Sequence, residues 1–108
     1  MPIVDIPVWQ IHDWDSFHDV FATALGFPEF YGRNLDAWID CLTYRDEDDG
    51  MASVTVEPGD VLTLQFGEAS AFARRCPDQY AALVEAAAFV NWRRIETGLR
   101  PIIALSFH

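Results

Sequence analysis

The chain has 108 residues, of which 51% are hydrophobic and 14% aromatic, and its formal charge is −10, with 17 acidic residues against seven arginines. This length is typical of a single domain, residues 1–108, with enough apolar material to form a core without disulfide or metal cross-links. The negative field repels nucleic acids and anionic membranes and attracts basic proteins, which excludes the first two as expected partners.

Three further features predict where the protein works. No apolar run approaches the ~20 residues that a membrane-spanning helix needs. The N-terminal sequence MPIVDI lacks the basic and apolar regions of a secretory signal. Cys41 and Cys76 form no disulfide framework and are expected to be reduced, buried thiols. Together these features predict a cytoplasmic protein, and we expect it to be a monomer when free.

The first part of the chain predicts a strand followed by a helix. Residues 3–8, IVDIPV, are rich in β-branched residues, and Pro7 lies near the end of this strand. Asp13 or Asp15 is expected to cap a helix that Gly26 ends. The buried face of this helix is expected to consist of Trp14, Phe17, Val20, Phe21, Ala24 and Leu25.

A second helix is expected from Leu35 to about Thr43, with Asn34 as its N-cap. Its buried stripe follows the spacing i, i+3, i+4 and i+7, and comprises Leu35, Trp38, Ile39 and Leu42. Asp36 and Asp40 are four residues apart, so their carboxylates share a different face of the helix. Like charges at this spacing weaken a helix. The pair is therefore a reason to expect a cationic partner.

The second half of the chain alternates strands and helices. Residues 45–50 predict an acidic loop, residues 53–56 an extra short strand, and residues 61–66 a central core strand. Helices are expected from residue 68 or 69 to 75 and from residue 77 to Gly98, before a last strand at 102–106. The buried face of the longer helix is expected to consist of Tyr80, Leu83, Val84, Ala87, Ala88, Asn91 and Ile95. This order predicts an α/β fold with parallel strands and right-handed crossovers.

Residues 28–43, PEFYGRNLDAWIDCLT, resemble the signature of the barstar family of intracellular ribonuclease inhibitors. The family pattern is an aromatic pair, Gly, any residue, Asn-Leu-Asp-Ala, two large apolar residues and Asp-Cys-Leu-Thr. Weaker similarity extends through the first strand and helix, including His18, and through the last strand. The resemblance implies a barstar-like fold, in which a small three-stranded parallel sheet packs with about four helices.

The resemblance also implies a function. The target would be a basic ribonuclease, whose active site the acidic helix and the adjoining aromatic loop would bind and occlude, as an immunity protein does. The partner-binding residues carried over from the family are Phe30, Gly32, Asn34, Asp36, Ile39, Asp40 and Thr43, with Asp40 at the centre.

The sequence departs from the family at four of its positions. Phe30 stands where the family often has Tyr, Ile39 where a Trp is common, and Arg33 where an acid occurs. A further family acid on the last long helix aligns near Asn91. Because such positions set specificity, these departures bear on which ribonuclease is bound.

Other chemistry is poorly supported, so we expect no enzyme, no cofactor and no metal site. The acidic loop fails the calcium-loop pattern because Arg45 and Val56 occupy ligand positions. His18 is expected to be a hydrogen-bonded structural histidine, and Tyr31 a core residue. Two alternatives stay open: a regulatory module that docks on a different basic protein and, as the weakest, a small hydrolase that uses Asp36 and Asp40.

Overall fold

The computed structural model describes residues 2–43 and 59–108. Within these ranges the chain forms a three-stranded parallel sheet in the order β1-β2-β3, accompanied by four α-helices and one 3-10 turn. The elements are β1 Ile3–Asp5, η1 Val8–Gln10, α1 Trp14–Leu25, α2 Leu35–Thr43, β2 Leu62–Phe66, α3 Ala69–Arg75, α4 Pro77–Glu96 and β3 Ile103–Phe107. The expected α/β class and barstar-like arrangement of sheet and helices are confirmed, whereas the extra strand expected at 53–56 lies outside the described residues.

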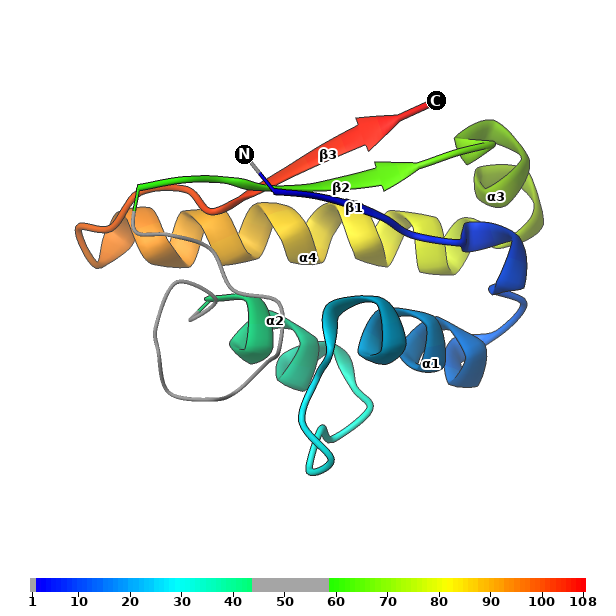
Figure 1. Ribbon diagram of the computed structural model, residues 1–108, viewed down its shortest axis with the longest axis horizontal. Helices are drawn as coiled ribbons and strands as arrows, with labels where there is room; N and C mark the ends of the chain where they lie inside the picture. The colour runs from blue at the N-terminus through cyan, green and yellow to red at the C-terminus, as the bar shows by residue number, and fades with distance from the viewer. Residues whose placement is uncertain (1, 44–58) are drawn as a thin grey trace.

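The sheet is buried on one face. β2 lies between its two neighbours and pairs Leu64 with Val4 of β1 and with Leu105 of β3. Its odd-numbered positions are only partly covered, whereas Leu62, Leu64 and Phe66 are buried. In Figure 1 helices α1, α2 and α4 lie on the same side of the sheet, and α3 lies beyond the end of β2. The alternating pattern of β2 therefore reflects one face on the core and one face toward water.

The ends of helix α1 follow from its sequence. The carboxylate of Asp13 accepts a hydrogen bond from the Ser16 backbone N–H at 2.8 Å, and the Ser16 hydroxyl accepts one from the Asp13 N–H at 3.0 Å. This reciprocal capping box satisfies two N–H groups that the helix itself cannot pair. Gly26 ends the helix with φ 65°, in the left-handed region that glycine enters without steric cost. Asp13, rather than Asp15, is therefore the cap.

The expected burial of two helices is partly wrong. Trp14 is 40% exposed because it lies in the first turn of α1, at the edge of the core. On α4, Val84, Ala88 and Ile95 are exposed, and the buried residues are Gln79, Leu83, Ala86, Ala87, Val90 and Arg94. Helix α4 contacts α2, α3 and β3, and these neighbours determine which of its residues are buried. Its buried face is therefore rotated relative to the one expected from the sequence.

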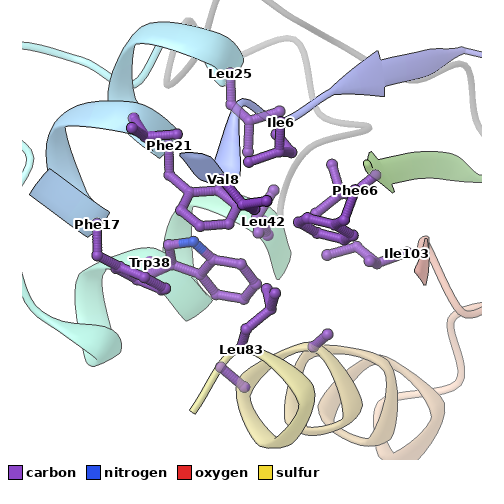
Figure 2. Packing of buried hydrophobic residues seen from close by; sticks show 14 of the residues in the cluster. Ile6, Val8, Phe17, Phe21, Leu25, Trp38, Leu42, Phe66, Leu83 and Ile103 are labelled. Atoms are coloured by element: carbon purple, nitrogen blue, oxygen red, sulfur yellow. The ribbon is translucent and has the colours of Figure 1, made fainter. Parts of the chain in front are cut away.

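Trp38 of α2 lies within the hydrophobic core shown in Figure 2. Its side chain is fully buried, and its ring packs edge-on against that of Phe21 at a centroid distance of 5.6 Å and an interplanar angle of 84°. Among the described residues its Nε1–H finds no hydrogen-bond acceptor. Leu42, one turn further along α2, is also fully buried. These two residues fix which face of α2 is turned inward.

Asn91 joins α4 to the start of β3. Its side-chain amide donates to the Ile103 carbonyl at 2.9 Å, and its oxygen accepts from the N–H groups of Ile102 at 2.9 Å and Ile103 at 3.1 Å. This explains the polar residue on an otherwise apolar part of the helix. Asn91 is half-buried and serves the architecture.

We expect Asn91→Ala to lower the free energy of unfolding by about 1–3 kcal/mol, because three backbone groups lose their partner in a half-buried setting. Chemical denaturation followed by circular dichroism measures the change. Ala88→Ser, on the exposed side of the same helix, is the control and should alter stability by no more than about 0.5 kcal/mol. Equal stability of the Asn91 variant and the parent would show that water replaces these bonds without loss.

Candidate functional site

The sequence-predicted binding residues lie in the loop before α2 and along α2 itself. Phe30 is 76% exposed, and Gly32, Asp36 and Asp40 are also exposed. Ile39 is half-buried and packs against the core. An exposed aromatic ring, a glycine and two carboxylates therefore lie on the loop before α2 and on α2 itself.

Asn34 holds the junction between the loop and α2. Its side-chain oxygen accepts from the Ala37 backbone N–H at 2.8 Å, which confirms it as the N-cap. Its amide nitrogen also donates to the Gly32 carbonyl at 3.3 Å. A Cβ atom on Gly32 would lie 3.3 Å from that same nitrogen, closer than most such contacts. Glycine at position 32 thus suits the turn that leads into the helix.

Thr43, which the family resemblance places among the partner-binding residues, is buried and does not lie on the exposed surface. It is 3% exposed, and its hydroxyl donates to the Ile39 carbonyl at 2.7 Å. Its own carbonyl accepts a hydrogen bond of 2.6 Å from Arg94 of α4. The carbonyls of a last helical turn lack partners within the helix, and a cation there also complements the helix dipole. Thr43 and the buried Arg94 are therefore structural, and the sequence reading missed Arg94 because buried arginines are rare.

Two contacts tie the loop to α1. Arg33 donates to the Asp19 carboxylate at 2.8 Å and to the Asp15 carbonyl at 3.0 Å. The hydroxyl of Tyr31 lies 2.6 Å from Nδ1 of His18, and both side chains are buried. The expectations of a structural His18 and a core Tyr31 are confirmed. The charge of Arg33 is balanced by α1, so this departure from the family pattern anchors the loop internally.

The buried pair has shifted acid–base properties. Burial lowers the pKa of His18 below its ordinary value of 6.5, and the nearby charge of Arg33 lowers it further. Burial also raises the pKa of Tyr31 above its usual value of 10.0. At neutral pH the imidazole and the phenol are therefore both uncharged, which suits a contact removed from water.

The lowered pKa of His18 predicts a loss of stability in mild acid. The unfolded chain takes up the proton near the ordinary pKa of 6.5, before the folded chain does. The stabilisation is complete above this pH and is lost as pH falls from there toward the folded-state pKa. His18→Gln should flatten this part of the profile of unfolding free energy against pH, measured by denaturant titrations. His12→Gln, at an exposed position, is the control, and an equally steep profile in the His18 variant would contradict the assignment.

Asp36 and Asp40 form what we call the acidic ridge. Both carboxylates are exposed. The side chain of Asp36 has no hydrogen bond or ion pair within the described ranges, whereas that of Asp40 accepts a hydrogen bond of 2.8 Å from Arg93 of α4. The side chains of this pair remain 51% exposed for Asp40 and 36% for Arg93. Such exposed pairs contribute only about 0–1 kcal/mol, so the ridge stays available to a partner.

Arg93 of α4 reaches the acidic ridge, whereas Asn91 does not. The resemblance placed a family acid of the last long helix near Asn91, but the Asn91 side chain faces β3. The residue of α4 that reaches the acidic ridge is Arg93, two positions later and carrying the opposite charge. The two positions differ by about 200° around a helix, so they lie on nearly opposite faces of α4.

Asp40→Ala is expected to change the free energy of unfolding by less than about 1 kcal/mol, because losing an exposed ion pair is offset by relief of repulsion with Asp36. Denaturant titration of this variant beside Asp36→Ala provides the comparison. A loss of more than about 2 kcal/mol would instead mark Asp40 as part of the structural framework.

The described residues offer neither a metal site nor a membrane-spanning helix. No group of three or more His, Cys, Asp or Glu side chains in residues 2–43 and 59–108 is arranged to hold a metal ion. No helix in the described part of the chain has the length and apolar character needed to cross a membrane.

The chain is similar to a known protein family and to a curated protein. A protein-family model described as Barstar (barnase inhibitor) matches residues 1–102. The chain is also 55% identical, over 29 residues, to a protein of Bacillus subtilis (strain 168) named "Putative ribonuclease inhibitor YrdF". The aligned segment covers 27% of this chain and 32% of that protein, so the match spans about a third of the relative.

Proposed function

Since the chain belongs to the barstar family, we propose that it inhibits a basic ribonuclease by binding over the active site of that enzyme. The observation that carries the proposal is the exposed acidic ridge beside the exposed ring of Phe30. Aromatic anchors next to complementary charges are the usual composition of an interface hot spot. The contact surface would comprise Phe30, Gly32, Asn34, Asp36, Ile39 and Asp40.

The proposed mechanism is electrostatic and steric. A ribonuclease gathers cationic side chains around the phosphate it cleaves, and the carboxylates of Asp36 and Asp40 would take the place of that phosphate. Arginine can hold a carboxylate through two parallel hydrogen bonds, which adds strength and geometric selectivity. The loop and α2 would then cover the groove against RNA. The protein acts in this scheme as an inhibitor without a catalytic step of its own.

Two structural features support tight and rapid binding. The anchoring of the loop to α1 by Arg33 and by the contact between Tyr31 and His18 means that little order has to be gained on association. The formal charge of −10 attracts a basic enzyme from a distance. Salt shortens the range of this attraction, because the Debye length falls from about 30 Å at 0.01 M to about 8 Å at 0.15 M ionic strength.

The ion pair between Asp40 and Arg93 favours a second candidate function. It places a positive charge beside the central carboxylate, so the surface is less uniformly acidic than the family pattern implies. A regulatory module would use the same surface to bind a different basic protein and would leave ribonuclease activity unchanged. The two candidates differ in whether RNA cleavage is blocked.

The test uses barnase, the enzyme named in the description of the matching family model. We expect the chain to form a 1:1 complex by calorimetry, to abolish RNA cleavage at equimolar concentration, and to associate more slowly as salt is raised. Asp40→Asn should weaken binding at least about tenfold, the equivalent of roughly 1.4 kcal/mol.

Asp78→Asn, an exposed carboxylate in the first turn of α4, is the matched control. It removes the same charge from the overall field, so it should change the affinity by no more than about twofold. Binding without inhibition would favour the regulatory module. An equal loss of affinity in both variants would show that net charge, and not the ridge, drives association.

A further inference from the structure

We propose that the groove between α2 and α4 is a second contact region of the same surface, and that it takes one apolar side chain of the ribonuclease that lies beside a lysine or arginine. This inference rests on the proposed function. It specifies an apolar side chain on the partner, which binding to the acidic ridge alone does not require. It assigns a role to the exposed side chains of Glu85 and Phe89 on α4.

The groove has a volume of about 190 Å³. Its walls are Leu35 and Ile39 on α2, and Ala82, Glu85, Ala86 and Phe89 on α4. Ala82 and Ala86 are one turn apart, and their short side chains leave the space between the helices unfilled. An engineered apolar cavity of about 150 Å³ in another protein admits benzene, so a groove of this size has room for one ring or branched aliphatic chain.

Aromatic side chains extend the apolar surface beyond the groove. Phe89 is 45% exposed, and its ring centroid lies 5.5 Å from that of Trp92, which is 55% exposed. Neither residue belongs to the buried core of α4. Exposed aromatic rings of this size are enriched at protein interfaces, where they become buried on association.

The groove is continuous with the acidic ridge. Leu35 and Ile39 immediately precede Asp36 and Asp40 on α2, and consecutive residues are about 100° apart around a helix. On the other wall, Arg93 lies one turn beyond Phe89 and bonds to Asp40 across the two helices. A partner that covers the ridge therefore comes within reach of the groove.

Charge complementarity decides what kind of partner fits. The apolar floor has Glu85 on one wall, and Asp36 lies next to the other. Carboxylates on both sides suit an apolar group whose neighbour is cationic. They disfavour a second copy of this chain, because each copy has a formal charge of −10 and would bring its own carboxylates to the contact.

Four variants test the groove against barnase. Ala82→Leu fills the space, Phe89→Ser removes one wall, and Glu85→Gln removes the charge. Ile95→Ser is the control, because Ile95 is an exposed apolar residue of α4 that does not line the groove. We expect the first two to weaken binding at least about fivefold and the control by no more than about twofold. Circular dichroism and thermal melting confirm that each variant is folded.

The outcomes separate this inference from the proposed function. If Asp40→Asn weakens binding while Ala82→Leu and Phe89→Ser bind barnase like the parent, the groove is overturned and the inhibitor proposal stands. If the parent chain does not bind barnase at all, both fall. Analytical ultracentrifugation of the chain alone tests whether a second copy of the chain occupies the groove. A dimer that Ala82→Leu abolishes would assign the groove to self-association and overturn the inference.

Discussion

Burial of Trp38 determines how α2 is presented. The indole packs edge-on against Phe21 of α1, and its fully buried position leaves no freedom to rotate α2 about its own axis. Asp36 and Asp40 then face water because they lie on the side of the helix opposite the core. The indole N–H has no acceptor among the described residues, so the contact rests on packing and not on a polar bond. A rigid helix whose orientation is set by a large buried ring is well suited to presenting charges in a fixed geometry.

Contacts with neighbouring residues fix both ends of α2. At its start, Asn34 caps the helix, and Arg33 fastens the preceding loop to α1 through Asp19. At its end, Arg94 reaches from α4 to the Thr43 carbonyl. Arg33 and Arg94 therefore support α2 from its two ends without contacting the acidic ridge, where both carboxylates remain exposed. The acidic ridge thus combines the high negative charge of the chain with a fixed position of its two carboxylates.

The sequence predicted the strands, the helices and the N-cap of α2 well, because periodicity and capping chemistry are local properties. The 16-residue signature also predicted the family. The sequence did not predict the burial of Thr43, which depends on an arginine 51 positions away. It did not predict which apolar residues of α4 are exposed. Helix α4 contacts α2, α3 and β3, and it has more apolar residues than these three contacts bury. The role of Asn91 was missed for a related reason: a polar residue on an apolar stripe signals a partner, but only the fold shows that the partner is the backbone of β3.

The contact between Asp40 and Arg93 has a consequence for how such proteins diversify. The acid belongs to the helix that the core holds rigid, whereas the base belongs to a different helix, and its side chain is 36% exposed. A change at position 93 can therefore alter the electrostatic character of the neighbouring helix while the packing around Trp38 stays intact. The charge of this surface would then change through α4, with the α2 scaffold inherited unchanged.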